Sequence, residues 1–367
     1  MPSSQDPVTG SGSLLRVMSE MGHEQVVHCC DPETGLRAII AIHDTTLGPS
    51  LGGVRMWPYA SEGEALTDVL RLSRAMTYKA AVSGLDLGGG KAVVIGDSRT
   101  GKSEGLFRAL GRFVEGLSGR YIAAEDVGME ERDMAWMRLE TRHVTGLPKA
   151  DGGIGNPSPV TAYGVYLSMK AAVKSAYGSD SLAGRRILIQ GAGNVASHLA
   201  HRLAGDGARL TVCDLHKSRA EHLAGLTGAD VVEAGDVFEA DADVFSPCAL
   251  GAVLNDRTIP MLKADVVVGG ANNMLENPER DAAALAAKGV LYVPDFVANA
   301  GGIMHVSCEL EGKEESHSYR LAEAIYDNTL RVLERAGRDG ATTARAAEAL
   351  AEERIRAAGG SARRLRV

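Results

Sequence analysis

The sequence lacks a long apolar run, and this absence excludes one class of protein. A membrane-spanning helix needs about 20 consecutive apolar residues, and no apolar run in the 367 residues approaches that length. The N-terminal residues also lack the apolar core of a secretory signal peptide. We therefore expect a cytoplasmic protein that has no membrane partner.

An excess of positive charge and a metal-binding cysteine pattern are also missing. The formal net charge is −8 at pH 7, which argues against a binding surface for nucleic acid or for an anionic membrane. The five cysteines show no C-x-x-C spacing, so neither a zinc site nor a disulfide framework is indicated. Adjacent Cys29 and Cys30 should point to opposite faces of a strand, and their use as small hydrophobic residues is typical of a reducing compartment.

What is present is enough apolar sequence for two hydrophobic cores. Of the 367 residues, 45% are apolar, which predicts two domains. Residues 1–13 are rich in Ser, Gly and Pro and are expected to be disordered. We place the first domain at residues 14–145 and the second at residues 146–329. Residues 359–367 are expected to form a flexible basic tail.

The first domain is predicted to contain strands and two amphipathic helices. Strands are predicted at residues 25–29, 36–43, 92–95 and 120–124. Residues 47–53 are punctuated by Gly and Pro, which predicts a loop. Ser61 and Glu64 form a capping box that opens a helix ending at Lys79, and Ser103 can cap a second helix.

Strands and helices alternate in the second domain. Strands are predicted at residues 187–190, 210–213, 244–245, 266–268 and 291–293. Ser158 and Pro159 open a long helix that ends near Tyr177, and further helices are predicted at residues 319–336 and 343–355. This alternation predicts a doubly wound parallel sheet.

Residues 76–91 carry two lysines in unusual settings. Lys79 follows Leu72 and Met76 on one helix face, and burying an ammonium group without a partner is costly. Three successive glycines then lead to Lys91, and glycine permits unusual backbone torsions and the close approach of a ligand. If one pocket holds both lysines, their charges repel, and one of them should lose its proton near the working pH. Most lysines lie on the surface, but the pair with its glycine turn favours a functional site.

A glycine-rich turn follows the first strand of the second domain. It reads GAGNVA from Gly191 to Ala196, a GxGxxA pattern that opens a helix at Asn194. Gly191 makes the tight turn, Gly193 lets the backbone approach a pyrophosphate, and the helix N-terminus favours the anion. Asp214 ends the next strand, where a carboxylate can accept hydrogen bonds from both ribose hydroxyls and repels a 2′-phosphate. The pattern predicts a dinucleotide site that prefers NAD to NADP.

Together with the segment PSLGGVR at residues 49–55, these features resemble the amino-acid dehydrogenase family that acts on glutamate, leucine, valine and phenylalanine. The resemblance covers residues 24–354 and is nearest to the leucine dehydrogenases, with the valine dehydrogenases next. The matching motifs are AIHDTTLGP (41–49), RMW (55–57), MTYK (76–79), GGGK (88–91), EDVG (125–128), GNPSPVTAYGVY (155–166), FSPCALGA (245–252), ANN (271–273) and PDFVANAGG (294–302).

The resemblance implies a fold and an assembly. An N-terminal α/β domain would bind the substrate and support oligomerisation, and a C-terminal Rossmann domain would bind NAD. A cleft would lie between the two domains, and the helices at about residues 330–358 would pack back on the first domain. A homo-oligomer is implied, and no metal is implied.

The resemblance also implies a reaction and its residues. A branched-chain L-amino acid would be deaminated oxidatively and reversibly to a 2-oxo acid and ammonia. Lys91 would be the base that activates water, and Asp126 would move protons to and from the amino group. Lys79, with Asn273 and the Gly52 backbone, would bind the α-carboxylate. NAD would be held by Gly191, Gly193, Asn194, Val195, Asp214, Thr161, Cys248, Ala249 and Asn272, with Thr161 at the nicotinamide carboxamide.

Pocket residues and departures from the family pattern follow from the same resemblance. The substrate side chain would lie among Leu51, Ala124, Ile303 and Val306. The sequence departs from the leucine dehydrogenase pattern at Met129, Met274 and His305. None of these belongs to the proposed catalytic residues, so they bear on rate, substrate preference and subunit contacts. For His305 a packed or solvated side chain is expected rather than a catalytic one.

Other functions remain open from the sequence. The same family includes enzymes for phenylalanine and for other aromatic or aliphatic amino acids. A protein that only senses NAD would need no base at Lys91. A Rossmann oxidoreductase for 2-hydroxy acids would call for a catalytic histidine with an acidic partner, and no such pairing stands out among the ten histidines.

Overall fold

The computed structural model describes residues 13–249 and 251–364, which form two compact α/β units. Unit 1 contains the described residues up to Gly155, together with Val306–Glu314 and those from Ala351 onward. Unit 2 contains the described residues of Asn156–His305 and Glu315–Leu350. Residues 1–12, for which we predicted disorder, lie outside the described residues.

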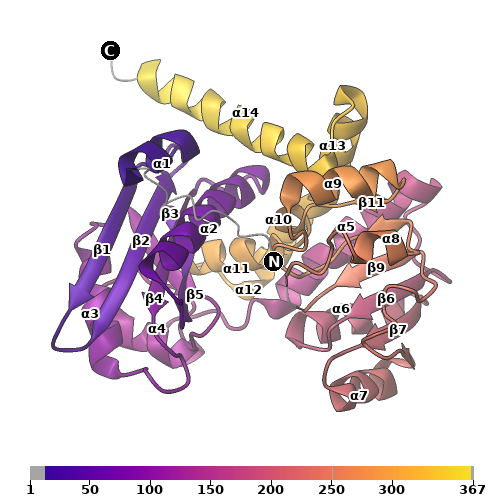
Figure 1. Cartoon of the computed structure of the whole chain (residues 1–367), viewed down its shortest axis with the longest axis horizontal. Coiled ribbons are helices and arrows are strands. Elements are labelled where there is room, and N and C mark those ends of the chain that lie inside the picture. The colour runs from indigo at the N-terminus through magenta and orange to yellow at the C-terminus, as the bar shows by residue number, and fades with distance from the viewer. Residues whose placement is uncertain (1–12, 250, 365–367) are drawn as a thin grey trace. The chain divides into compact units, whose positions relative to one another are not determined.

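The core of unit 1 is a mixed five-stranded sheet with the order β1-β2-β4-β3-β5 (Figure 1). Its strands are β1 (Gln25–Asp31), β2 (Leu36–Asp44), β3 (Ser50–Trp57), β4 (Gly88–Ile95) and β5 (Tyr121–Glu125). Strand β2 is antiparallel to β1 and β4, whereas β3 is parallel to β4 and β5. The parallel part therefore lies at one side of the sheet.

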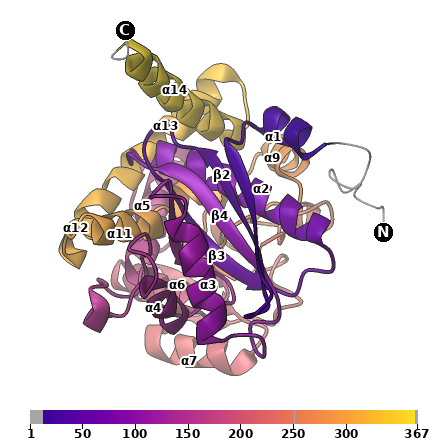
Figure 2. The same ribbon diagram turned by 90° about the vertical axis from the view of Figure 1, so that its left-hand side faces the viewer.

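Helices cover both faces of this sheet (Figure 2). They are α1 (Leu14–Met21), α2 (Glu62–Val82), α3 (Glu104–Glu115) and α4 (Glu131–Arg138), followed by the short 3-10 helix η1 (Lys149–Asp151). Successive side chains of β2 point to opposite faces: Ile39 and Ala41 pack with α1 and α2, and Ile40 and Ile42 pack with α3 and α4. We call the side that α1 and α2 cover the α2 face.

Two predicted helix starts are confirmed in unit 1. The Ser61 hydroxyl accepts the N–H of Glu64 at 3.1 Å, and the Ser103 hydroxyl accepts the N–H of Leu106 at 3.2 Å. Both bonds satisfy backbone donors that the first helical turn leaves without a partner. Helix α2 continues past its predicted end at Lys79 and ends at Val82.

Two predictions about the glycine-rich segments of unit 1 are wrong. Residues 50–53 belong to strand β3 rather than to a loop, and residues 88–90 belong to strand β4 rather than to a turn. These glycines serve close packing instead of unusual torsions: a Cβ on Gly89 would lie 2.1 Å from the backbone nitrogen of Thr77. Glycine in a sequence usually indicates a loop. In these two strands glycine is needed instead because another part of the chain, distant in sequence, packs closely against the backbone.

A buried histidine pair joins α1, β2 and α2. The Nε2 of His43 donates to the carbonyl of Met21 at 3.0 Å, and its Nδ1 accepts the Thr77 hydroxyl at 2.8 Å. The Nε2 of His23 lies 2.9 Å from the hydroxyl of Ser73, and the two rings are 4.8 Å apart. The pKa of each histidine is lowered to about 4, mainly by burial, and for His23 the nearby charge of His43 contributes to the lowering.

Unfolding of unit 1 is therefore expected to become easier in mild acid. Because the folded pKa of each histidine lies below its unfolded value near 6.5, both stabilise the fold above pH 6.5, and this stabilisation is lost as the pH falls toward 4. Each histidine contributes at most about 3 kcal/mol. Thermal unfolding between pH 7 and 4.5 measures the effect. The pH dependence should flatten in His43→Gln, whereas a matching change at exposed His201 should leave it unaltered; equal slopes in both variants would refute the assignment.

Unit 2 is built on a parallel six-stranded sheet with the order β11-β10-β9-β6-β7-β8. Its strands are β6 (Arg186–Gln190), β7 (Arg209–Cys213), β8 (Asp230–Val231), β9 (Val244–Pro247), β10 (Val266–Val267) and β11 (Leu291–Tyr292). The doubly wound sheet that the alternation predicts is thus confirmed, with β8 as a short addition. Strand order reverses between β6 and β9, and ligands of such sheets bind at the carboxyl ends of the strands at this point.

Among the described residues, unit 2 contains eight helices that lie wholly within it, and the predicted bounds agree best for the first of them along the chain. They are α5 (Ser158–Tyr177), α6 (Asn194–Gly205), α7 (Lys217–Thr227), α8 (Thr258–Met261), α9 (Pro278–Ala287), α10 (Asp295–Ala298), α12 (Glu315–Ala322) and α13 (Ala324–Asp339). Helix α5 spans its predicted residues and packs against α6 and α13. No helix among the described residues is long and apolar enough to cross a membrane.

The C-terminal helices differ from the prediction in three respects. The expected helix at residues 319–336 is divided into α12 and α13 at Glu323. Helix α14 (Thr343–Arg364) is longer than predicted, so most of the expected flexible tail is helical. Only its residues from Ala351 onward belong to unit 1, whereas α13 belongs to unit 2. Helix α11 (Gly301–Leu310) also has residues in both units.

Candidate active site

The parallel strands of unit 1 bring several predicted site residues to one face. Strand pairing sets Leu51 of β3 beside Gly89 of β4 and beside Ile122 of β5. Lys91 and Ala124 each follow two residues later on those neighbouring strands. Because side chains alternate along a strand, Leu51, Lys91 and Ala124 all point to the α2 face.

Lys91 and Asp126 form a largely buried ion pair on this face. The Nζ of Lys91 donates to Oδ2 of Asp126 at 2.7 Å, and the two side chains are 6% and 18% exposed. Gly53 leaves room for the pair, because a Cβ there would lie 2.5 Å from the Cβ of Asp126 and 3.1 Å from the Nζ of Lys91. Lys91 therefore contacts a carboxylate. The attraction to this carboxylate offsets the charge repulsion between Lys91 and Lys79 that we predicted from the sequence.

The cations around Asp126 keep its carboxyl group ionised. Burial by itself raises the pKa of Asp126, but the charges of Lys91 and Arg55 and their hydrogen bonds bring the pKa below its usual value. Asp126 is consequently a carboxylate at neutral pH. It can act as a proton acceptor once a reacting group lies near it.

Lys79 occupies the last turn of α2 and is half-buried. Helix α2 packs closely on β4 here, because a Cβ on Gly89 would lie 2.2 Å from the hydroxyl oxygen of Thr77. Lys79 follows Thr77 by two residues and Lys91 follows Gly89 by two, so neighbouring elements carry the two lysines. The helix face of Lys79, which the sequence pattern indicates to be apolar, is only half-buried at Leu72. The face of α2 that packs in the core is formed by other residues.

Sequence reasoning missed a third cation at the site. Arg55 of β3 donates through Nε to Oδ2 of Asp126 at 3.0 Å and through Nη1 to Oδ2 of Asp68 at 3.0 Å. The hydroxyl of Tyr59 donates to the same Asp68 oxygen at 2.6 Å. Asp68 lies three helical turns before Lys79 on the same side of α2. This spacing is the sequence signal that could have placed Asp68 at the site. We call this set the charge cluster: Lys91, Asp126, Arg55, Asp68 and Tyr59.

The glycine-rich turn of unit 2 has the backbone that the sequence predicted. Gly191 has φ of +105°, a region that L side chains avoid. Gly193 is exposed, with open space where a Cβ would stand, and no side chain caps the N-terminus of α6 that it begins. The oxygens of Asp214 accept the N–H groups of Ala192 and His216, both at 2.8 Å. The uncapped helix end and the open turn fit a dinucleotide pyrophosphate.

Other predicted cofactor residues gather around the same strand ends. A Cβ on Gly191 would lie 3.0 Å from the Cβ of Ala249. A Cβ on Gly270 would lie 2.8 Å from Cγ1 of Val195 and 3.6 Å from the sulfur of Cys248. These residues follow β6, β9 and β10, so the point where strand order reverses brings Val195, Cys248 and Ala249 together.

The predicted asparagine pair lies in a braced segment of unit 2. Asn273 has φ of +51° and Ala252 has φ of +58°, which few residues other than glycine adopt. The N–H of Ala252 donates to the carbonyl of Asn273 at 2.7 Å. The side chain of Asn299 donates to Oδ1 of Asn272 at 2.8 Å and was missed from the sequence, although it lies in a matching motif.

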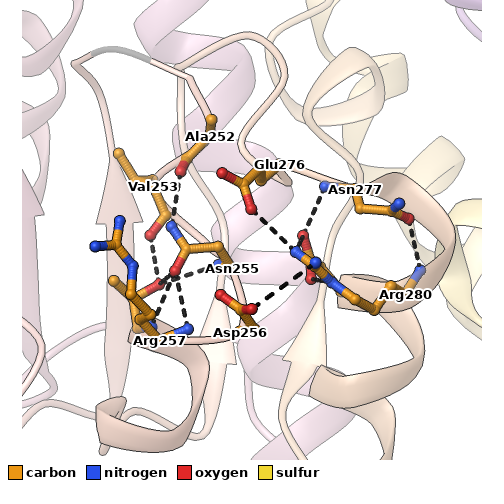
Figure 3. Close-up of polar contacts among 10 residues, drawn as sticks. Ala252, Val253, Asn255, Asp256, Arg257, Glu276, Asn277 and Arg280 are labelled. Carbon is orange, nitrogen blue, oxygen red and sulfur yellow. Dashed lines mark hydrogen bonds and ion pairs between the residues drawn. The ribbon is translucent and has the colours of Figure 1, made fainter. Parts of the chain in front are cut away.

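Figure 3 shows how polar side chains hold the turn that pairs with this segment. The amide nitrogen of Asn255 donates to the carbonyl of Ala252 at 3.1 Å. Arg280 pairs with Glu276 at 3.1 Å and lies 4.0 Å from Asp256 (Figure 3). The start of α9 and the turn before α8 are thereby joined, and this joint supports the strained backbone at Ala252.

Thr161 and Ile303 lie where α5 and α11 begin. The hydroxyl of Thr161 donates to the carbonyl of Pro157 at 2.9 Å. A Cβ on Gly302 would lie 2.9 Å from that hydroxyl oxygen, so the two helix starts are in contact within unit 2. Ile303 is the next residue and is 5% exposed.

Val306 belongs to the part of α11 that lies in unit 1. Glu309, one turn later, accepts the N–H of Gly146 at 2.8 Å. The segment of Gly146 also pairs with β5 at Ala123, the residue before Ala124. Glu309 therefore fastens the helical turn of Val306 to the segment beside Ala124, and this role was not predicted.

Two family models match almost the whole chain. A model described as Glu/Leu/Phe/Val dehydrogenase, dimerisation domain, matches residues 23–143. A model described as Glutamate/Leucine/Phenylalanine/Valine dehydrogenase matches residues 152–216 and 210–360. The chain belongs to this dehydrogenase family. The resemblance drawn from its motifs is confirmed.

Individual members of the family are similar over the same length. Leucine dehydrogenases from Thermoactinomyces intermedius and Geobacillus stearothermophilus are 53% and 52% identical to it, and each alignment covers 93% of both chains. The crystal structure of L-tryptophan dehydrogenase from Nostoc punctiforme has a TM-score of 0.84 at 44% identity and covers 94% of this chain and 99% of that one. The fold of this chain is therefore shared with that L-tryptophan dehydrogenase over nearly the full length of both chains.

The three departures from the leucine dehydrogenase pattern are all buried packing residues. Met129 lies in the core between the sheet of unit 1 and α3 and α4, and Met274 lies in the core of unit 2. His305 is 1% exposed, as expected for a packed histidine. None of them belongs to the charge cluster.

Proposed function

We propose that this family member catalyses the reversible, NAD-dependent oxidative deamination of branched aliphatic L-amino acids. Leucine, valine and isoleucine would give the corresponding 2-oxo acid, ammonia, NADH and a proton. The observation that carries the proposal is the buried pair of Lys91 and Asp126, on the same sheet face as the apolar side chains of Leu51 and Ala124. The names of the leucine dehydrogenase relatives favour the same substrates.

The substrate would be held at both ends by groups of different character. Lys79, the backbone of Gly52 and Asn273 would bind the α-carboxylate through charge and hydrogen bonds. The side chain would lie against Leu51 and Ala124, which carry no polar side-chain atom, and against Val306 and Ile303. NAD, when bound, supplies the acceptor for the hydride that leaves Cα. The cofactor residues proposed are Gly191, Gly193, Asn194, Val195, Asp214, Thr161, Cys248, Ala249 and Asn272.

Lys91 and Asp126 would carry the proton transfers. Loss of the hydride leaves an iminium group on the substrate, whose carbon is attacked by water. Neutral Lys91 takes one proton from that water, so the new C–O bond forms without free hydroxide. Asp126, a carboxylate at the start, takes a proton from the substrate ammonium group before the hydride leaves, and it returns this proton to the amino group of the carbinolamine. The C–N bond then breaks, ammonia leaves, and the carboxylate of Asp126 takes the proton of the carbinol hydroxyl as the C=O bond forms. A sensor that only binds NAD would need neither of these groups.

Asp214 favours NAD over NADP in this proposal. Its carboxylate, held by the turn of Ala192 and by His216, has oxygens that accept hydrogen bonds and repel a further phosphate. The basic residue nearest along the chain, Lys217, is paired with Glu233. The carboxylate of Glu233 therefore partly offsets the positive charge of Lys217.

A panel of the twenty common amino acids, each with NAD and with NADP, tests the function. NADH formation should show the highest kcat/KM for leucine, valine or isoleucine. The rate with NADP should be far lower at equal concentration. A best rate with glutamate or phenylalanine, or equal use of the two cofactors, would contradict the proposal.

We also propose a homo-oligomer. The domain model that matches residues 23–143 is described as a dimerisation domain. A solved glutamate dehydrogenase from Thermus thermophilus, 26% identical with a TM-score of 0.77, is described as hetero-hexameric and covers 94% of this chain and 90% of that one. Light scattering of the purified protein would measure the mass directly.

A further inference from the structure

The ion pair at the site opposes part of the proposed chemistry. A lysine acts as a base only when it is neutral, but a carboxylate at 2.7 Å stabilises the charged ammonium of Lys91. Asp126 must itself be an anion for its role in the reaction, so its protonation cannot be what frees Lys91 from the ion pair. The site therefore needs a second positive charge that weakens the hold of Asp126 on the Lys91 proton.

Arg55 is placed to supply that charge. Its Nε and the Nζ of Lys91 both contact Oδ2 of Asp126, at 3.0 and 2.7 Å. The two nitrogens are consequently less than about 6 Å apart, where like charges repel appreciably even in a partly solvated site. The Arg55 side chain is 20% exposed, so solvent screens it only in part. A guanidinium does not lose its proton in proteins, so this charge is permanent.

Other charged and titratable groups lie near the pair. Lys79 of α2, the helix that packs on β4, is a further cation on this side of the sheet and is unchanged in every variant below. Asp68 contacts Arg55 and partly offsets its charge. Burial and the hydrogen bond to Asp68 raise the pKa of Tyr59, and burial raises that of Tyr121, so both phenols stay neutral. Burial lowers the pKa of Arg55, but the two carboxylates raise it by more. Arg55 is thus the fixed cation that shares the carboxylate with Lys91.

We propose that Arg55 is a positioning residue that holds Asp126 as an anion and, by sharing its oxygen, lets Lys91 release its proton. Asp68 sets how strongly Arg55 acts. The inference rests on the proposed deamination, because it concerns the base of that reaction. It assigns a function to two residues, Arg55 and Asp68, that touch neither substrate nor cofactor in the proposed mechanism.

The test compares pH profiles of kcat/KM for leucine oxidation. In Arg55→Gln, Lys91 keeps its proton to higher pH, so the rising limb should move upward by about one pH unit. Arg55→Lys retains a cation beside Asp126 and should restore most of the profile. The NAD dissociation constant should stay unchanged in both, because the cofactor turn lies in unit 2.

Asp68→Asn supplies the result that a merely structural role would not give. It removes a negative charge beside Arg55 while keeping an oxygen that can accept the same hydrogen bond. The rising limb should move in the opposite direction, downward by about half a pH unit. If Arg55 only supported the fold, both substitutions would lower the rate or the stability. The two pH profiles would then not shift in opposite directions.

Arg108→Gln is the matched control. Arg108 of α3 donates through Nε to Glu140 at 2.7 Å and through Nη1 to Glu104 at 3.3 Å, the same pattern outside the charge cluster. Its profile should equal that of the wild type. An unmoved limb in both Arg55→Gln and Asp68→Asn would overturn the inference, and Asp68→Asn decides alone if Arg55→Gln does not fold. A wild type that oxidises no branched-chain amino acid would instead overturn the proposed function.

Discussion

Replacing Lys91 with methionine is expected to lower the turnover of leucine oxidation by about 10²–10⁴-fold, the usual cost of losing a general base. Methionine keeps the apolar stem of the side chain but cannot take a proton from water. The dissociation constant for NAD should hardly change, because the glycine-rich turn belongs to unit 2. Fluorescence titration with NADH and steady-state rates would separate the two effects.

Lys102 offers a control of similar burial. Its side chain is 11% exposed and pairs with fully buried Asp133, so Lys102→Met tests the loss of a buried lysine without the loss of the base. It should reduce stability rather than turnover. Small primary amines added to Lys91→Met should restore part of the rate, since they can replace the missing base. More than about a tenth of wild-type turnover in Lys91→Met would refute this role.

Exchanging Leu51 for lysine and Val306 for serine together should turn the substrate preference toward glutamate. In the wild type, Leu51 is 1% exposed, and a second carboxylate beside it would be buried without a partner. The cost is on the order of several kcal/mol, or 10³-fold and more in kcat/KM. The added ammonium and hydroxyl would supply that partner and would lower activity on leucine.

Volume-conserving changes provide the reference for this exchange. Leu51→Met should keep most of the leucine activity, because cores tolerate apolar substitutions of equal size. Among apolar substrates discrimination should be gentle, since one methylene is worth roughly 1–3 kcal/mol. Phenylalanine should react slowly beside the methyl group of Ala124. An unchanged glutamate rate in the double variant would place the side-chain pocket elsewhere.

Local signals in the sequence were sufficient for much of the fold. The serines at positions 61 and 103 cap the helices that they were predicted to cap. Helix α5 spans the predicted residues, and the parallel strands of unit 2 follow the predicted alternation. Each of these features depends on residues a few positions apart, which the sequence shows side by side.

Glycine was the residue type that sequence reasoning read least well. Gly52 would place a Cβ 1.6 Å from the carbonyl oxygen of Gly90, so β3 can pair with β4 only if that side chain is absent. The reason for the glycine lies on another strand, out of reach of any local pattern. At Gly191 the reason is a local turn with positive φ, and there the prediction is confirmed.

The sequence by itself determined the family, the two α/β units and the identity of the residues proposed for catalysis and binding, because these are carried by residue types at fixed spacing. Only the tertiary structure decided which charge stands next to which. Lys91 and Asp126 are 35 positions apart and Arg55 and Asp126 are 71 apart, and they meet because β4, β3 and β5 pair in one register. Coulomb interactions depend on distances of a few ångströms, and those distances are set by strand pairing and packing rather than by separation along the chain.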